Sequence, residues 1–257
     1  MHKTTLLCAI LAGLLTAPAA VAQEQRNATV GPAGETVLVA GATGRLGSHL
    51  IQLLYDAGYT VRGMSRDPSR AELRYGDQYD WIAADLTMPD TLPAAVAGVD
   101  RVICAVASNN PTGPSNPETI DYGGTRNLID ASVAAGVKQF VLVSSVGVTH
   151  RFHLLNLTYG EVLIWKRKAE EYLRASGLVY TIVRPGGLRP GPASVEGVAI
   201  AQGDAKGGSY IFLPDAAAVM VATIGNPSAY GKTFEILSDR EQSADAWRDD
   251  FTLLIAD

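Results

Sequence analysis

The chain has 257 residues, of which 47% are hydrophobic and 18% are charged. A chain of this length can bury one sizeable hydrophobic core, and one α/β domain of this size is common. The formal net charge of −5 argues against a nucleic-acid-binding surface. No apolar run reaches the ~20 residues that a membrane-spanning helix needs.

The N-terminus predicts a secretory signal peptide over residues 1–22. A weakly basic start precedes the short apolar run Leu6–Leu15, and Ala20-Val21-Ala22 forms an A-x-A cleavage signal. A wrongly assigned start codon and an uncleaved anchor are the alternatives. Residues 23–34 are polar and are predicted to form a disordered leader. If the signal is real, we expect an exported protein, periplasmic or secreted, and otherwise a cytoplasmic one.

The two cysteines do not predict a disulfide. Cys8 lies in the predicted signal peptide, and Cys104 lies in an apolar strand pattern. A single remaining cysteine cannot form a bridge within one chain. We expect Cys104 to be a small core residue.

The segment Thr36–Gly47 predicts a strand, a phosphate-binding turn and a helix in direct succession. An apolar, β-branched run meets the glycines of Gly41-Ala42-Thr43-Gly44-Arg45-Leu46-Gly47, and a helical pattern continues to Ala57. Glycines allow a tight turn and a close approach of the backbone to a pyrophosphate, and a helix N-terminus attracts anions. A tight turn alone would also need glycines, but the strand and helix on either side favour dinucleotide binding.

The end of the second expected strand, at residues 59–64, favours NADP(H) over NAD(H). NAD-preferring folds carry an acidic residue near this point for the ribose hydroxyls. Here Arg66 stands where a guanidinium could hold a 2′-phosphate, and Arg62 could assist it. Asp67 precedes a proline and is interpreted as a helix N-cap.

The rest of the chain alternates between apolar strand patterns and helical patterns. Strands are expected at 79–84, 99–107, 139–144, 181–184 and 232–237, and helices at 91–97, 118–136 and 215–224, the last capped by Asp215. Such alternation predicts an α/β fold, a Rossmann-type doubly wound parallel sheet with ligands at the strand C-termini. We expect one NAD(P)-binding domain over 35–257.

Further expectations concern the ligand-binding edge and the C-terminal part. Asp85, with Leu86, could border the adenine or simply cap a turn, and Ala105 is small enough to let a cofactor pass. The loop 108–117 is expected at the mouth of the site. Residues 186–257 are expected to form a small substrate-side region, in which 195–213 resembles a hairpin with its turn at 203–208. The tail after Ser238 could include a short helix around Trp247.

Several motifs together resemble the atypical short-chain dehydrogenase/reductases of the NAD(P)H-binding, NmrA-like type. The resemblance extends over about residues 36–236. It is carried by the glycine turn, by Arg66-Asp67-Pro68, and by the segments Asp121–Leu128, Phe140–Ser145, Lys166–Leu178 and Tyr180–Gly186.

The resemblance implies a set of site residues. The glycine turn would hold the pyrophosphate, Arg66 the 2′-phosphate, and Asp85 with Leu86 the adenine. Ser144 would lie near the nicotinamide, Lys166 would bond its ribose, and Pro185 with Gly186 would lie beside its carboxamide. Ser144 and Lys166 are therefore the candidate catalytic residues.

The wider family places a tyrosine four residues before the lysine as proton donor, because this spacing puts both on one helix face. Here Val162 occupies that position, and Tyr159 lies seven residues before Lys166. Tyr159 could reach the pocket mouth, but a surface position is the simpler interpretation. The missing tyrosine puts catalysis in doubt and leaves cofactor binding unaffected.

Other catalytic patterns are absent from the sequence. His150 and His153 lack a third ligand for a metal site, so no metal is expected, and no G-x-S-x-G motif suggests a hydrolase. Two functions remain: an NADPH-dependent oxidoreductase acting on a small carbonyl or quinone, and a non-catalytic NADP(H)-binding sensor or regulator. Isomerase or epimerase chemistry is a weaker third, since it usually needs the same tyrosine.

Overall fold

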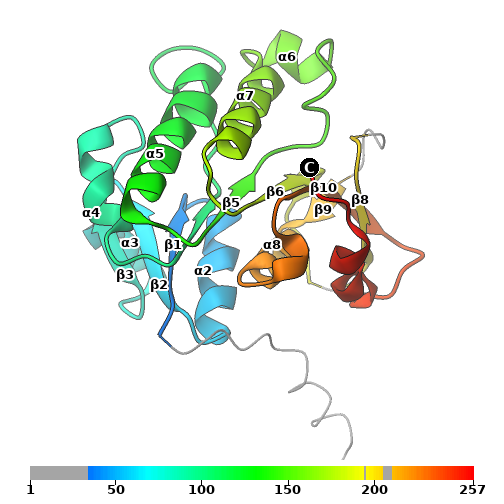
Figure 1. Cartoon of the computed structure of the whole chain (residues 1–257), viewed down its shortest axis with the longest axis horizontal. Coiled ribbons are helices and arrows are strands. Elements are labelled where there is room, and N and C mark those ends of the chain that lie inside the picture. The colour runs from blue at the N-terminus through cyan, green and yellow to red at the C-terminus, as the bar shows by residue number, and fades with distance from the viewer. Residues whose placement is uncertain (1–33, 194, 205–209) are drawn as a thin grey trace, which may run out of the picture.

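A computed structural model describes residues 34–193, 195–204 and 210–257. The predicted signal peptide at 1–22, nearly all of the leader at 23–34, and most of the turn predicted at 203–208 lie outside these residues. Within the described part, a central sheet is covered by helices on both faces (Figure 1). No helix among these residues is long and apolar enough to cross a membrane.

The central sheet has the strand order β3-β2-β1-β4-β5-β6-β10-β8, eight strands in the described chain. Neighbours are parallel except at one edge, where β8 runs antiparallel to β10. The doubly wound parallel fold predicted from the sequence is confirmed. Its strands are β1 (Thr36–Ala40), β2 (Thr60–Ser65), β3 (Asp80–Ala83), β4 (Arg101–Cys104), β5 (Gln139–Val143), β6 (Tyr180–Pro185), β8 (Gly197–Ala201) and β10 (Lys232–Asp239).

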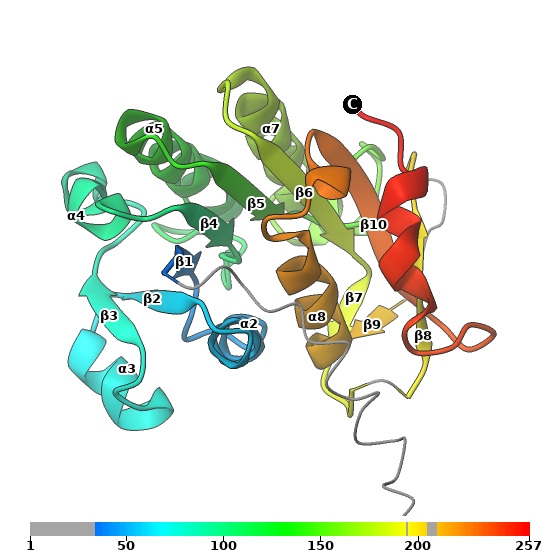
Figure 2. The same ribbon diagram turned by 60° about the horizontal axis from the view of Figure 1, so that its bottom comes forward.

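Helices lie on both faces of this sheet (Figure 2). Helices α2 and α8 pack against each other on one face, and α4, α5 and α7 form a row on the other. The helices are α2 (Gly47–Asp56), α3 (Pro68–Tyr75), α4 (Leu92–Val96), α5 (Thr125–Ala135), α6 (Leu154–Thr158), α7 (Val162–Ala175) and α8 (Leu213–Thr223). A π-helix at Glu118–Gly124 leads into α5, and a 3₁₀ helix at Ala246–Leu253 carries the buried Trp247.

Strand alternation divides the interior into two apolar cores. Val37 and Val39 of β1 face the core that α2 and α8 cover, whereas Leu38 and Ala40 face the core under α4, α5 and α7. Successive side chains of a strand point to opposite faces, so a strand buried on both sides reads as a continuous apolar run. Cys104 is fully buried in the second core, as expected, and burial raises the pKa of its thiol.

Two expectations for the C-terminal part are wrong. Residues 195–213 do not form a hairpin: β8 pairs antiparallel with β10, and β9 (Tyr210–Phe212) pairs in parallel with β7 (Gly187–Arg189). Asp215 does not cap α8, because the helix already begins at Leu213. Pro214 extends the helix toward the N-terminus, since its fixed φ suits a first turn.

The boundaries near the ligand-binding edge also differ in part. The fourth strand ends at Cys104, so Ala105–Ala107 leave the sheet and turn across its C-terminal edge. The α5 segment ends at Gly136, as predicted, with a left-handed φ of 70°. Asp67 accepts a hydrogen bond from the Arg70 amide at 3.1 Å, which confirms it as the N-cap of α3.

A buried ion-pair network joins α7 to β6 and β10. Arg184 donates two hydrogen bonds to the Glu170 carboxylate, at 2.9 and 2.7 Å, and a third to Glu235 at 3.1 Å. Arg174 reaches Glu170 at 3.2 Å from the solvent side. Burial raises the pKa of Glu235, whereas hydrogen bonds and charge from both carboxylates outweigh the burial of Arg184 and raise its pKa.

The loop after β5 is held by Asp204, which is almost fully buried. Its carboxylate accepts bonds from the backbone amides of Gly147 and Thr149, at 2.6 and 2.9 Å, and from the Thr149 hydroxyl at 2.7 Å. Burial opposes the charge, but these hydrogen bonds outweigh it and lower the pKa of Asp204.

We expect Glu170→Gln to lower the free energy of unfolding by roughly 3 kcal/mol, because a buried guanidinium loses its charged partner. Glu171→Gln is the matched control on the same helix: its exposed pair with Arg167 should contribute less than about 0.5 kcal/mol. Urea denaturation at pH 7 measures both, and equal midpoints for the two variants would contradict the expectation.

The Asp204 contacts predict a pH dependence of stability. Because the folded pKa of Asp204 lies below the unfolded value of about 3.9, its charge stabilises the fold above that pH, and the contribution is lost as pH falls through the folded pKa. Asn tolerates the left-handed backbone at this position, where φ is 55°. Asp204→Asn should therefore cost about 2 kcal/mol at pH 7 and progressively less below pH ~4, in urea titrations at several pH values. A pH-independent difference would exclude this explanation.

Candidate functional site

The glycine turn between β1 and α2 is sterically restricted to glycine. Gly41 has a φ of 87°, and a Cβ there would lie 2.7 Å from the Ala105 carbonyl oxygen. A Cβ on Gly47 would overlap the Gly41 carbonyl oxygen, and Gly44 donates its amide to the same oxygen at 2.9 Å. The turn thus brings the backbone into direct contact with α2 and with the end of β4.

The backbone amides of this turn are available to a ligand. Those of Thr43, Arg45 and Leu46 donate to no acceptor among the described residues. They lie at the N-terminus of α2, where the helix dipole favours an anion. A cofactor pyrophosphate fits this turn in both shape and charge.

A second feature is a basic hollow beside the turn, of about 220 Å³. Arg66 follows β2, and Arg70 and Arg74 follow at helical spacing on α3; all three line the hollow. Arg66 is exposed and forms no ion pair with a described residue. The Tyr75 hydroxyl donates to the Thr43 carbonyl oxygen at 2.9 Å, which ties α3 to the glycine turn.

The prediction that Arg62 assists Arg66 is wrong. Arg62 donates to Asp80 at 2.6 Å and to the carbonyl oxygens of Ala95 and Ala97, at 3.2 and 2.7 Å. These contacts hold it under α4, away from the glycine turn. Arg70 and Arg74 were missed from the sequence, although their spacing of four after Arg66 was a usable signal.

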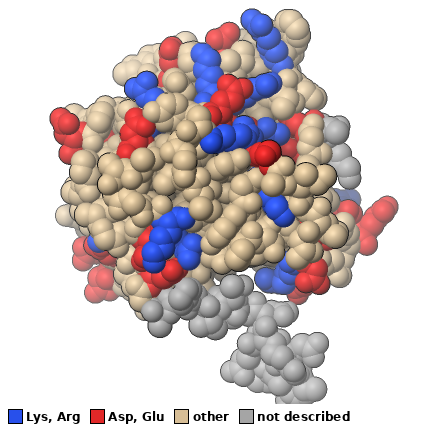
Figure 3. Space-filling model, in the orientation of Figure 1, with Lys and Arg blue, Asp and Glu red and all other residues tan. Residues whose placement is uncertain are grey.

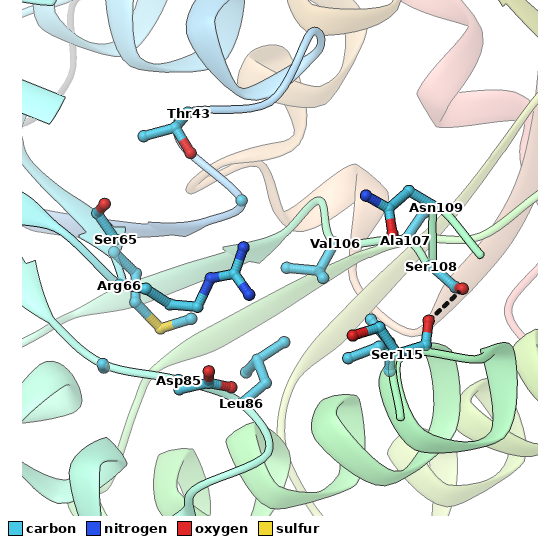
Figure 4. A pocket seen from close by; sticks show the side chains of 14 residues that line it. Thr43, Ser65, Arg66, Asp85, Leu86, Val106, Ala107, Ser108, Asn109 and Ser115 are labelled. Atoms are coloured by element: carbon cyan, nitrogen blue, oxygen red, sulfur yellow. Dashed lines mark hydrogen bonds between the residues drawn. The ribbon is translucent and has the colours of Figure 1, made fainter. Parts of the chain in front are cut away.

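Another hollow, of about 200 Å³, opens at the C-terminal edge of β1, β2 and β4. Its lining includes five predicted cofactor residues, Gly41, Thr43, Arg66, Asp85 and Leu86, and adds Val106 and Ala107. Figure 4 shows the Arg66 side chain crossing this hollow toward Val106, with Asp85 and Leu86 on one side and Thr43 on the other. The predicted Ala105 lies just outside the lining, where its carbonyl contacts Gly41.

Asp85 is engaged in its own turn. Its Oδ1 accepts from the amide and the hydroxyl of Thr87, both at 2.8 Å. This agrees with the capping alternative for Asp85. The opposite wall of the hollow is the 108–117 loop, where the Ser108 hydroxyl bonds the Ser115 carbonyl oxygen at 2.6 Å (Figure 4).

Lys166 does not face solvent. Its Nζ lies 2.9 Å from Oδ1 of Asp121, whose side chain is completely buried, and Oδ2 of Asp121 accepts the Ser108 amide at 3.0 Å. Asp121 therefore joins α7 to the wall of the hollow at the C-terminal edge of β1, β2 and β4. Sequence spacing could not identify this pair, because its members lie on separate elements.

Ser144 also makes an internal contact. Its hydroxyl donates to Glu170 at 2.6 Å, so its proton points into the buried network. Pro185 ends β6 and accepts the Val146 amide at 3.1 Å, and the Gly186 amide donates to Ile236 at 3.0 Å. These contacts hold the ends of β5, β6 and β10 together on the predicted nicotinamide side.

Tyr159 follows α6 and reaches the pocket wall: its hydroxyl lies 3.4 Å from the Ser108 carbonyl oxygen. Val162, at the position of the missing tyrosine, is buried. His153 caps α6 by accepting the Leu155 amide at 3.2 Å. The described residues contain no cluster of three or more His, Cys, Asp or Glu suited to a metal.

Comparisons with known proteins relate this chain to nicotinamide-dependent enzymes. A family model described as NAD(P)H-binding matches residues 41–227. Protein TIC 62 of Pisum sativum is 36% identical over 233 residues, which cover 79% of this chain and 43% of the relative. Sanguinarine reductase of Eschscholzia californica is 32% identical over 255 residues, covering 83% of this chain and 93% of the enzyme.

A solved structure from Bacillus halodurans, described as an NAD-dependent epimerase/dehydratase, superimposes with a TM-score of 0.72. It is 32% identical, and the match covers 80% of this chain and 94% of that one. The chain spans about two fifths of the length of the TIC 62 relatives that it matches. The family model alone covers well over half of the chain. This chain therefore belongs to the NAD(P)H-binding oxidoreductase family, in the NmrA-like group of atypical short-chain dehydrogenase/reductases, and its cofactor is a nicotinamide dinucleotide.

Proposed function

We propose that this protein is an NADPH-dependent reductase of a small carbonyl or quinone substrate. The observation that carries the cofactor preference is the basic hollow of Arg66, Arg70 and Arg74 beside the glycine turn. Three guanidinium groups around one hollow suit a 2′-phosphate, which carries about two negative charges, better than they suit an uncharged ribose hydroxyl.

The candidate cofactor-binding residues form two groups, one for each half of the cofactor. The turn 41–47 would hold the pyrophosphate, and Arg66 with Leu86 would border the adenosine half. Ser144, Lys166, Pro185 and Gly186 would border the nicotinamide half. When bound, reduced nicotinamide supplies the hydride; the protein orients the ring and excludes water.

Lys166 is the group best suited to hold the nicotinamide ribose. An ammonium has three donors, and an ion pair with Asp121 at 2.9 Å holds it in place. The buried Asp121 limits the orientations of Lys166, which supports a positioning role. Ser144 could donate to a substrate oxygen only after its hydroxyl turned away from Glu170.

The same contacts favour a second candidate, a non-catalytic NADP(H) sensor or regulator. No tyrosine precedes Lys166 by four residues, and Ser144 and Lys166 both bond internal carboxylates. Cofactor-dependent association with a partner protein, without NADPH oxidation, would distinguish this function from the first.

Export remains a prediction, because residues 1–22 lie outside the described part of the chain. Several of the plant relatives bear chloroplastic names, which supports a targeting role for the N-terminal segment. A protein exported in the unfolded state would have to acquire its cofactor after translocation.

We expect NADPH to bind at least about tenfold more tightly than NADH, in titrations followed by nicotinamide fluorescence. Arg66→Ala should weaken NADPH binding by roughly 10- to 100-fold and NADH binding by less than about threefold, because the lost interaction is with the 2′-phosphate. Arg62→Ala is the matched control, since Asp80 and two carbonyl oxygens already hold that guanidinium. An unchanged NADPH-to-NADH ratio in Arg66→Ala would refute the assignment.

We expect NADPH oxidation with at least one member of a panel of quinones, small carbonyls and sanguinarine. With that substrate, Lys166→Met should lower kcat/KM by roughly 100-fold. Lys168→Met on the same helix should not change it, because Lys168 is exposed and lies over Trp165. Tight NADPH binding without turnover on any substrate would favour the sensor, and no binding of either cofactor would exclude both functions.

A further inference from the structure

Helix α6 exposes its apolar side chains and buries a polar one, the reverse of an ordinary surface helix. Of its five residues, the polar Asn156 is the buried one. Leu154 and Leu157 are 68% and 75% exposed, and Phe152 just before the helix is 89% exposed. Surface helices normally turn their apolar side chains inward, so this arrangement needs a specific cause.

Hydrogen bonds of Asn156 hold α6 in this orientation. Its amide donates to the carbonyl oxygens of His150 and Arg151, at 3.4 and 3.1 Å. Its side-chain oxygen accepts from the backbone amides of Leu163 and Ile164 at the start of α7, at 2.9 and 3.3 Å. Turning the leucines inward would break all four bonds and expose a buried amide, so the exposure of the apolar side chains is built into the fold.

A basic hollow of about 390 Å³ adjoins α6. Arg151, which precedes Phe152, lines it together with Arg167 and Lys168 of α7, one acid, Glu161, and the apolar Val148 and Ile164. Arg167 also bonds Glu171 at 3.0 Å, and Lys168 lies 3.9 Å above the Trp165 ring. Lys and Arg side chains stand at the upper edge of Figure 3, with acids between them, where Figure 1 places α6 and α7.

The sequence between Asp130 and Glu161 contains no acidic residue, in a chain with 26 of them and a net charge of −5. This acid-free segment includes the four large apolar side chains at 152, 154, 155 and 157. Exposed apolar side chains beside a group of cations are a combination that interfacial segments present to anionic lipids.

We propose that the α6 end of the molecule docks on an anionic phospholipid surface. Phe152, Leu154 and Leu157 enter the boundary between headgroups and acyl chains. The hollow beside α6, lined by Arg151, Arg167 and Lys168, binds a lipid phosphate. The acidic remainder of the protein is repelled by the same surface, which orients the molecule with α6 toward the lipid.

A second copy of the chain suits this surface less well. In a two-fold symmetric contact the same patch meets itself, so the cations around one hollow would face those around the other. An anionic lipid surface removes this repulsion and also covers the apolar side chains.

The test uses the full chain. The run Leu6–Leu15 could itself bind vesicles, so insertion of α6 must be observed directly with a label on α6. Cys8→Ser removes a cysteine that would otherwise react with the label. An environment-sensitive fluorophore on Thr158→Cys reports insertion of α6, and the same label on Thr252→Cys, beside the equally exposed Leu253, is the matched control. With vesicles containing phosphatidylglycerol, we expect a blue shift at position 158 and none at 252.

Binding is then compared among variants labelled at position 158. Replacing Phe152, Leu154 and Leu157 by Ser should abolish the blue shift, and Arg151→Ala should weaken the apparent affinity about fivefold. Leu253→Ser should change nothing. These substitutions are at exposed positions, so an unchanged melting temperature is expected to accompany them.

Three results would overturn the proposal. The first is no blue shift with anionic vesicles at millimolar lipid. The second is an equal shift with vesicles of phosphatidylcholine alone. The third is self-association in light scattering that the triple Ser variant abolishes, since a second copy would then cover α6.

Discussion

The bidentate pair between Arg184 and Glu170 is the interaction on which the predicted nicotinamide side of this fold depends. Both groups are buried, so their desolvation must be balanced by well-aligned charge-assisted hydrogen bonds. Arg184 lies on β6 and Glu170 on α7, and the pair therefore fixes the helix that carries Lys166 against the sheet. Glu170 also accepts a hydrogen bond from the Ser144 hydroxyl at the end of β5, besides its contact with Arg174. One carboxylate thus sets the relative positions of both candidate catalytic residues.

The first half of the fold could be predicted because its signals are local. A β-branched run, a glycine turn and a helical pattern follow one another within Thr36–Ala57, and each requires the conformation that its neighbours also require. The cap at Asp67 was predictable for the same reason, since Asp before Pro determines its own turn. Arg66 lies directly beyond a strand whose position was clear, so its place at the ligand-binding edge followed from chain order.

The features missed by the sequence analysis are those set by distant partners. The parallel pairing of β7 with β9 and the antiparallel pairing of β8 with β10 join segments that are distant in the sequence, and no local pattern records such pairings. Arg62 was assigned to the wrong edge because its partner Asp80 belongs to the neighbouring strand. Likewise, nothing in the spacing of Lys166 shows that its ammonium is paired with Asp121, 45 residues earlier in the chain and on a π-helix.

The pairing of Lys166 and Ser144 with carboxylates bears on the choice of substrate. Where a tyrosine precedes the lysine, the positive charge lowers the tyrosine pKa and supports proton transfer to a substrate oxygen. Here Asp121 balances the charge of Lys166, and the Ser144 proton is directed to Glu170. The site is therefore better suited to holding and orienting than to donating a proton. For the reductase proposed above, such an arrangement would favour substrates that accept a hydride without simultaneous protonation, such as quinones, over simple ketones, whose alkoxide product needs a proton at once.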